Sequence, residues 1–327
     1  MSASGNPLHM AIISTNDLAQ SLLFYRDIIG MDVVFDGTCR GNAFEHHWQI
    51  AAGTSARAVL LQASGLDVGQ VLLLHFNPAS GRRIKEEGIR SYYGLFNLNL
   101  YVDDIKSVAD DLKSKGFELW AEPVEPDSEY TDGQAVEALF DDPDGVAMNL
   151  IKLIGGDENS FIGRVRMEVE KREKTKTGFT PVATSSHIVR DGEAAIAFYR
   201  DVLGMSVAMD LELSSPDSNV MLGRPKAGTT RSAFLEGSNL FGKIIVSHPL
   251  NYELPGSVAA AVAPNIGYLA QSFVVANIEE ALEKSIKLGA TLFSSATKLD
   301  VPGLGAREAL IIGCPGSGAL IELVSIS

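Results

Sequence analysis

Few residues of this chain stand at a spacing that is typical of a known catalytic motif. The two cysteines, Cys39 and Cys314, are far apart and lack a metal-like spacing, so neither a disulfide framework nor a zinc site is indicated. The sequence has no nucleophile elbow, phosphate-binding loop or Ser-His-Asp signature, which argues against hydrolases and nucleotide-dependent enzymes. Histidines and carboxylates therefore remain as the candidates for acid–base chemistry or metal binding.

Three polar stretches have simple structural interpretations. His46 and His47 stand at the start of a strand expected at 48–51, where adjacent side chains point to opposite faces, so at most one of them can line a cavity. The Asp-Asp-Pro-Asp-Gly segment at 141–145 favours a turn rather than a calcium site. His187 and Arg190 are expected in a solvated turn at the end of a strand.

Composition limits the partners of the chain. A hydrophobic fraction of 46% with 21% charged residues is typical of globular proteins. The formal charge of -14 would repel a phosphate backbone, which argues against nucleic-acid binding. Residues 1–7 lack the pattern of a secretory signal, and Pro264 and Gly267 interrupt the most apolar long stretch, 258–275. We therefore expect a cytoplasmic protein that neither spans nor binds a membrane.

The sequence repeats itself once. The segment Phe-Tyr-Arg-Asp-Ile-Ile-Gly-Met at 24–31 recurs as Phe-Tyr-Arg-Asp-Val-Leu-Gly-Met at 198–205. Residues 101–119 likewise resemble 274–292 at nearly the same offset. Two single residues keep the same order, with Gly94 matching Gly267 and His75 matching His248. Four landmarks in the same order predict a duplication.

The length of 327 residues suits two domains of ordinary size. We predict a first domain at 1–162, a charged linker at 163–178 and a second domain at 179–327. In the linker, Val165 and Val169 alternate with charged residues, which could form an edge strand.

Each half consists of two smaller units with the same local pattern. A strand leads to a helix-capping residue, a short amphipathic helix and a glycine stop, and further strands follow. The helices are expected from Asn16 or Asp17 to about Ile28, from Asp103 or Asp104 to Gly116, from Asp191 to Gly204 and from Asn277 to Gly289. In the first unit the strands are expected at 31–35, 48–51, 58–62 and 71–76. The predicted fold class is therefore α+β, with four βαβββ units in curved, mixed or mostly antiparallel sheets flanked by helices.

Together these features resemble the vicinal-oxygen-chelate superfamily of glyoxalases, bleomycin-resistance proteins and extradiol dioxygenases. The resemblance rests on the strand that begins at His9, the helix that ends at 24–31, and the Asp-Pro-Asp-Gly turn that leads into 146–153. It covers nearly the whole chain and implies tandem modules whose paired units curl into cups. In that family, metal ligands come from the first, fourth, fifth and eighth strands of a module.

Carried onto the first module, these ligand positions are His9, Leu73, Asn97 and Asn149, and in the second module they are Thr184, Val246, Ala270 and Glu322. His9 and Glu322 share a cup only if the first unit of one module pairs with the second unit of the other. His75 lies two residues beyond Leu73 and is therefore expected on the same strand face. The resemblance thus implies an Fe, Mn or Zn site at His9, His75 and Glu322, although Ala270 stands where a further ligand is usual.

The other cup would contain Thr184, His248, Asn97 and Asn149, without a carboxylate. The two asparagines could bind a carbonyl or hydroxyl group of a small molecule, since buried amides need hydrogen-bond partners. His75 and His248 are further candidates for substrate binding. This cup is expected to be vestigial.

The resemblance implies an enzyme that acts on a small organic compound, aromatic or carbonyl-containing, as a ring-cleaving dioxygenase or a glyoxalase-type lyase or isomerase. Catalysis would use Glu322 and His9 with a divalent metal. Two alternatives stay open. The enzyme could be metal-free, with His9 and Glu322 as acid and base, or the chain could be a binding protein that sequesters a hydrophobic small molecule. A homodimer is also left open.

Overall fold

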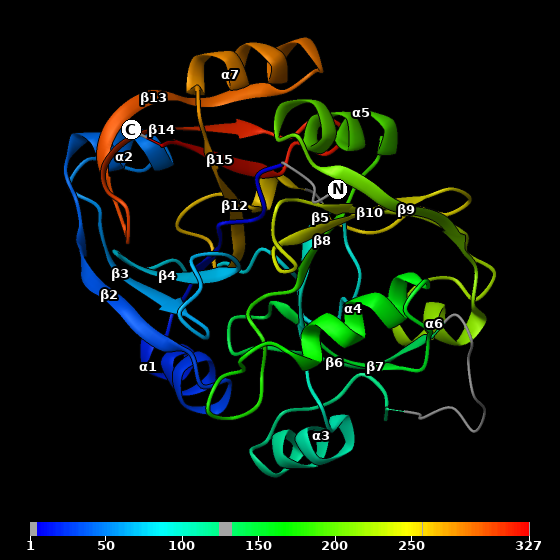
Figure 1. Cartoon of the computed structure of the whole chain (residues 1–327). Helices are drawn as coiled ribbons and strands as arrows, with labels where there is room; N and C mark the ends of the chain where they lie inside the picture. Colours follow the sequence, from blue (N-terminus) through cyan, green and yellow to red (C-terminus); the bar gives the residue numbers. More distant parts are fainter. Residues whose placement is uncertain (1–4, 124–132, 257, 327) are drawn as a thin grey trace.

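The computed structural model describes residues 5–123, 133–256 and 258–326. In this part of the chain the strands form two curved sheets, of eight and seven strands, and short helices lie around them (Figure 1). None of the described helices is long and apolar enough to cross a membrane.

The first unit contains two helical segments between its strands. Its elements are β1 (Met10–Ser14), α1 (Leu18–Leu22), the π-helical continuation η1 (Leu23–Ile28), β2 (Asp32–Cys39), α2 (Asn42–Trp48), β3 (Ser55–Gln62) and β4 (Gln70–Asn77). Asp17 begins α1 by accepting hydrogen bonds from the amides of Ala19 and Gln20. The strand expected at 48–51 is wrong, because Phe44, His47 and Trp48 bury one face at helical spacing and Gln49 ends α2 in the left-handed conformation.

The second unit is shorter. Its elements are β5 (Gly94–Tyr101), α3 (Ile105–Ser114), β6 (Gln134–Asp141) and β7 (Ala147–Ile154). Among the described residues, only a single bridge between Leu119 and Phe140 stands where a further strand was expected. The linker forms a helix, α4 (Phe161–Glu170), instead of an edge strand. Val165 and Val169 lie four residues apart and are both buried, which is the spacing of one helix face.

The second half repeats the first. Its third unit contains β8 (Thr184–Ile188), α5 (Gly192–Ala197), η2 (Phe198–Val202), β9 (Ser206–Leu213), α6 (Pro216–Met221), β10 (Thr230–Glu236) and β11 (Lys243–Pro249). After the short turn η3 (Val258–Ala260), the fourth unit contains β12 (Gly267–Val275), α7 (Ile278–Lys287), β13 (Thr291–Val301), β14 (Gly305–Gly313) and β15 (Leu320–Ser325). Helix α6 occupies the same place in its unit as α2.

The units pair across the two halves of the chain. The eight-stranded sheet has the order β13-β14-β15-β12-β1-β4-β3-β2, so the first unit shares it with the fourth. The seven-stranded sheet has the order β6-β7-β5-β8-β11-β10-β9, so the second unit shares it with the third. Antiparallel pairs β1–β12 and β5–β8 join the units. This is the exchanged pairing in which His9 and Glu322 can share one cup.

Both faces of each sheet are covered. On one face, which we call the helix face, residues such as Ala11, Leu73 and Phe273 pack with the helical residues Phe24 and Tyr25. On the opposite face, which we call the cup face, Met10, Leu72 and Ala270 pack with Phe44 and Trp48 of α2. The alternation of side chains along each strand therefore decides which residues line a cup. We call the hollow of the eight-stranded sheet the first cup and that of the seven-stranded sheet the second cup.

Candidate functional site

A row of side chains crosses the floor of the first cup. Strand register places Gln70 of β4 beside Met10 of β1, Met10 beside Ser272 of β12, and Ser272 beside Glu322 of β15. All four residues are buried. Gln70 Oε1, Ser272 Oγ and Glu322 Oε2 are buried and have no hydrogen-bond partner. Buried polar atoms normally have partners, so this row is an unusual feature of a protein interior.

His9 joins this row because the chain contains one extra residue before β1. Leu8 and Ala11 both pack into the core of the helix face, although strict alternation over three residues would place them on opposite faces. His9 and Met10 between them therefore both lie on the cup side. The charge of Glu322 raises the pKa of His9, which agrees with this placement, but burial lowers that pKa more strongly.

The hydrogen bonding of His9 leaves one ring nitrogen available. His9 Nδ1 lies 2.8 Å from the carbonyl oxygen of Asp67. Because a carbonyl only accepts, Nδ1 carries the hydrogen and Nε2 carries the lone pair. Nε2 is buried and has no partner. A neutral imidazole held in this tautomer can accept a proton or bind a cation.

Glu322 is held by a histidine of α2. His47 Nε2 lies 2.8 Å from Glu322 Oε1, and the two side chains are 0% and 5% exposed. The exposed neighbour, His46, instead contacts Ser295. One of the two adjacent histidines thus reaches the cup, as expected, but from a helix rather than a strand. The pairing of His47 with Glu322 was not predicted, because the two residues are 275 positions apart in the chain.

Helix α2 fills most of the first cup. This helix packs beside β13 and β14 (Figure 1). The remaining cavity has a volume of about 20 Å³ and is lined by Phe44, Trp48, Leu72, Leu74 and Glu322, among others. A cavity of this size accommodates roughly one water molecule. A larger ligand can therefore enter only if α2 moves.

His75 does not take part in this cup. Its Nδ1 lies 3.1 Å from the carbonyl oxygen of Thr15, and the side chain is half-buried. His75 alternates in phase with Leu73, which belongs to the core of the helix face, whereas Leu72 and Leu74 line the cup. The expectation that Leu73 and His75 face the cup is wrong by one residue, and such a shift moves every side chain of a strand to the other face.

The first cup brings together fewer imidazole and carboxylate groups that could hold one ion than the predicted metal site contains. Among the residues that the structure describes, no three His, Cys, Asp or Glu side chains converge as ligands of one ion. His9 Nε2 and Glu322 Oε2 are accompanied by the neutral oxygens of Gln70 and Ser272, whereas Leu72 and Ala270 are apolar. The predicted site of His9, His75 and Glu322 is therefore not assembled.

The second cup has a more polar lining than the first. Asn97 and Asn99 of β5 alternate with Leu98 and Leu100, which pack on the helix face, so both asparagines face the cup. Asn149 of β7 lies beside Asn99 in the register. The three asparagines are 2–4% exposed, and the Oδ1 atom of each is buried without a partner. Asn97 and Asn149 thus lie in one cup, as expected, and Asn99 was missed although it continues the alternation.

Two charged side chains also reach the second cup. Glu137 of β6 lies between Val136 and Ala138, which pack on the helix face, and it accepts a hydrogen bond from Asn149. Burial raises the pKa of Glu137, and the positive charge of Arg224, which follows α6, opposes this. The expectation of a cup without a carboxylate is therefore wrong. The pattern of β6 could have indicated Glu137, because it interrupts an apolar run in alternation.

His248 lies outside the second cup. It alternates in phase with Ile244 and Val246, which belong to the core of the helix face. A Cβ atom placed on Gly192 of α5 would lie 3.0 Å from His248 Nδ1, so the ring packs against that helix. His248 occupies the place of His75 in the other half, beside Arg231 where His75 lies beside Arg57. The repeat is confirmed, but the expectation that His248 lines the cup is wrong.

His187 is fully buried rather than solvated. Its Nδ1 lies 2.9 Å from the Tyr199 hydroxyl, and its Nε2 lies 2.7 Å from the Ser317 hydroxyl. Burial lowers the pKa of His187 to about 3. The imidazole is therefore neutral at physiological pH and acts as a structural hydrogen-bonding group.

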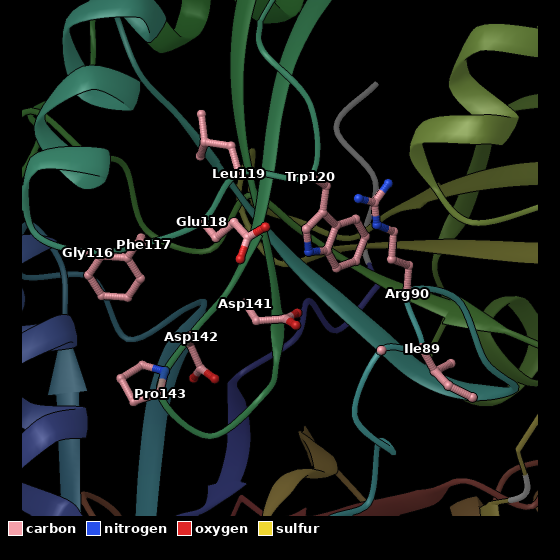
Figure 2. Close-up of a pocket in the computed structure, with 11 residues that line it drawn as sticks. Ile89, Arg90, Gly116, Phe117, Glu118, Leu119, Trp120, Asp141, Asp142 and Pro143 are labelled. Carbon is pink, nitrogen blue, oxygen red and sulfur yellow. The ribbon is translucent and has the colours of Figure 1, made fainter.

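A larger pocket lies outside both cups. It has a volume of about 540 Å³ and is lined in part by Arg90, Trp120, Asp141 and Asp142. Figure 2 shows the Arg90 guanidinium beside the Trp120 indole, and the two groups lie 5.7 Å apart. Asp141 pairs with Lys85. None of the unpartnered buried polar atoms in the described residues belongs to this lining. The cups, which contain such atoms, are therefore better candidates for ligand binding.

The Asp-Asp-Pro-Asp-Gly segment forms a turn whose side chains hydrogen-bond to α1 and η1. Asp142 accepts hydrogen bonds from the amides of Asp144 and Val146 at 2.9 and 2.7 Å, and from the Tyr25 hydroxyl at 2.8 Å. Asp144 accepts a hydrogen bond of 2.7 Å from the Ser21 hydroxyl. The expected turn role is confirmed. These contacts also tie the first unit to the second within one half of the chain.

Comparisons with known proteins agree with this architecture. Residues 7–150 match the family described as the Glyoxalase/Bleomycin resistance protein/Dioxygenase superfamily. Glyoxalase I from Zea mays shares the fold with a TM-score of 0.59 and 17% identity, over 98% of this chain and 92% of that chain. A putative dioxygenase from Bacillus subtilis has a TM-score of 0.56 and 10% identity, over 99% and 86% of the two chains. No curated protein sequence matches this chain. Residues 7–150 thus match this superfamily in sequence, and the chain as a whole shares the two-domain fold of glyoxalase I.

Proposed function

We propose that this chain is an enzyme that moves a proton on a small carbonyl-containing compound in the first cup, as an isomerase or lyase does. Two observations carry the proposal: His9 and Glu322 lie on the same cup face, close enough for the charge of Glu322 to raise the pKa of His9, and His47 is hydrogen-bonded to Glu322. His9 Nε2 and Glu322 Oε2 are buried, have no partner and lie on the same cup face. Two proton acceptors in a water-poor hollow are the groups that proton transfer next to a carbonyl requires.

The hydrogen bonds suggest a separate role for each group. His9 would act as the base, because its Nδ1–H is held by Asp67 and its lowered pKa keeps Nε2 unprotonated near neutral pH. Glu322 would accept a hydrogen bond from a hydroxyl group of the substrate through Oε2, and the protonated His9 Nε2 would return the proton to the substrate. His47 is a positioning residue, because it holds Glu322 Oε1 and has no need to touch the substrate.

The residues favour the metal-free form of this chemistry. A divalent ion at His9 Nε2 and Glu322 Oε2 would need a third protein ligand, and no third His, Cys, Asp or Glu side chain of the described residues converges there. We therefore derive no step through a metal. A ring-cleaving dioxygenase is supported less well for the same reason, because non-haem iron oxygenases typically hold their metal with two histidines and one carboxylate.

Access to this site depends on α2, which carries both His47 and Trp48. A substrate larger than water displaces Phe44 and Trp48 from the cup, since about 20 Å³ remains beside them. The chain contains two tryptophans, Trp48 and Trp120. A Trp120→Phe variant consequently makes the fluorescence of Trp48 a reporter of ligand entry.

The test measures proton exchange directly. Hydroxyacetone, dihydroxyacetone and glyceraldehyde are incubated in D2O with protein treated with a chelator, and NMR follows the loss of the proton next to the carbonyl. We expect exchange with at least one compound, and a decrease of about 100-fold or more in His9→Gln and Glu322→Gln, which is the range for general acid–base catalysis. The control, His75→Gln, lies on the helix face and should keep the activity. Absence of exchange, or exchange that both variants retain, would refute the proposal.

One observation favours a binding protein as the second candidate. Phe44, Trp48, Leu72 and Leu74 give the first cup a largely apolar lining. A hydrophobic compound that replaces the α2 side chains would bury its surface there. Tight binding reported by Trp48 without any proton exchange would support sequestration over catalysis.

A further inference from the structure

The second cup contains several hydrogen-bonding atoms that the fold leaves without partners. Asn97, Asn99 and Asn149 each have an unpartnered Oδ1 and are at least nine-tenths buried. Asn99 and Asn149 are direct neighbours across β5 and β7, and Asn97 lies two residues from Asn99 on the same face. Side chains at these positions lie about 5–8 Å apart, so one small molecule can reach all three.

The contacts of the amides identify the free atoms as acceptors. Asn99 Nδ2 donates to the Thr184 hydroxyl, and Asn149 donates to Glu137. An amide that uses its nitrogen in this way presents its oxygen to the cup. Three free acceptors side by side call for a molecule that brings several hydrogen-bond donors, such as hydroxyl groups.

Arg224 contributes an unpartnered hydrogen-bond donor, whereas the three asparagines contribute unpartnered acceptors. Its Nε–H is buried without a partner, while Nη1 lies 3.4 Å from the Thr230 hydroxyl. Thr230 alternates with Ala233 and Leu235 of the helix face, so it lies at the cup end of β10. A guanidinium with a free N–H in a buried place is suited to a carboxylate.

The charged side chains of the second cup indicate which kind of anion it could bind. Glu137 and Arg224 carry opposite charges, and Lys243, which lies beside Thr184 in the register, adds one positive charge. Lys243 Nζ already donates to the carbonyl oxygen of Leu240. The charge of Glu236 acts on Lys243 in turn, so Arg224 is the cation whose unpartnered N–H can bind a carboxylate, which suits a ligand with a single negative charge.

We infer that the second cup is a binding site for a small hydroxy-monocarboxylate, whose hydroxyl groups donate to Asn97, Asn99 and Asn149 and whose carboxylate accepts from Arg224. The site uses residues of the seven-stranded sheet and of the segment after α6. It is separate from the first cup, which belongs to the eight-stranded sheet. Its ligand therefore binds without His9 or Glu322.

The experiment uses glycerate as the probe and the full chain, with isothermal titration calorimetry as the measurement. Glycerate should bind, while propionate, which lacks the hydroxyls, and glycerol, which lacks the carboxylate, should each bind at least tenfold more weakly. Arg224→Gln and Asn149→Leu should each weaken glycerate binding at least tenfold. Arg200→Gln changes an exposed arginine that pairs with Asp201 and should leave binding unchanged.

Further variants separate this inference from the proposed catalysis and from misfolding. His9→Gln should leave glycerate binding intact even if it abolishes proton exchange in the first cup. Asn97→Ser keeps a small polar group, and a variant with wild-type circular dichroism and thermal unfolding that binds glycerate more weakly supports the site. Failure of glycerate to bind, equal binding of propionate, or binding that Arg224→Gln and Asn97→Ser both leave unchanged would overturn the inference.

Discussion

Protonation of His187 should make the protein markedly less stable in mild acid. The imidazole is fully buried between the hydroxyls of Tyr199 and Ser317, and burial lowers its pKa from 6.5 to about 3. The unfolded chain therefore binds a proton at this residue between pH 6.5 and 3, and the folded chain does not. Stability from His187 is complete above pH 6.5 and is lost progressively as the pH falls through this window.

The size of the effect follows from the two pKa values. One pKa unit corresponds to about 1.4 kcal/mol. Between pH 6.5 and pH 4, a span of about 2.5 pH units, only the unfolded state binds a proton at His187. Protonation of this residue alone should therefore lower the free energy of unfolding by about 3 kcal/mol at pH 4 relative to pH 7. That is a large part of the 5–15 kcal/mol that stabilises typical proteins.

The assay is urea unfolding at several pH values between 7 and 4, followed by circular dichroism. His187→Gln removes the titrating group, so the free energy of unfolding of this variant should fall less steeply as the pH is lowered. The difference in free energy of unfolding between wild type and His187→Gln should narrow by about 3 kcal/mol from pH 7 to pH 4. Ser317→Ala removes one hydrogen bond and no titrating group, and it should keep the wild-type slope. A gap between wild type and His187→Gln that is the same at pH 7 and pH 4 would refute the reasoning.

Three further predictions concern stability. Glu322→Ala should cost about 1–3 kcal/mol because it leaves the buried His47 without its hydrogen-bond partner, whereas a double variant with His47→Leu should recover part of that loss in urea unfolding. Burial and the charge of Asp144 raise the pKa of Asp142, so stability should fall as the pH rises above about 4, the ordinary pKa of an aspartate, and unfolding of Asp142→Asn should depend less on pH there. His75→Ala should cost only about 1 kcal/mol in thermal unfolding, because it loses one partly buried hydrogen bond, and a loss of several kcal/mol would contradict this placement.

Local sequence patterns determined the parts of the fold that involve neighbouring residues. The capping positions Asp17, Asp104 and Asn277 each accept a hydrogen bond from the first turn of their helix, as the residue types indicate. The repeated segments at 24–31 and 198–205 form equivalent helical segments. Such features depend on contacts within a few residues, which the sequence displays directly.

Errors arose where one residue of register or one helical turn decided the outcome. His75 was placed on the wrong face because the cup-facing residues of β4 are Leu72 and Leu74 rather than Leu73. The segment around His47 was expected to form a strand, because a short apolar run fits the periodicity of a strand as well as that of a helix. Packing against β13 and β14 favours the helix. Glu137 was overlooked because its importance depends on Asn149 and Arg224, which follow it by 12 and 87 positions.

Only the tertiary structure decided which units pair. Each βαβββ unit can bury the same apolar strand faces against either neighbour, so consecutive and exchanged pairing are equally compatible with the local pattern. The sequence by itself determined the units, their order and the presence of His9 and Glu322. The antiparallel pairing of β1 with β12 determined that those two residues lie in one cup, because interstrand hydrogen bonds join segments that are about 260 positions apart.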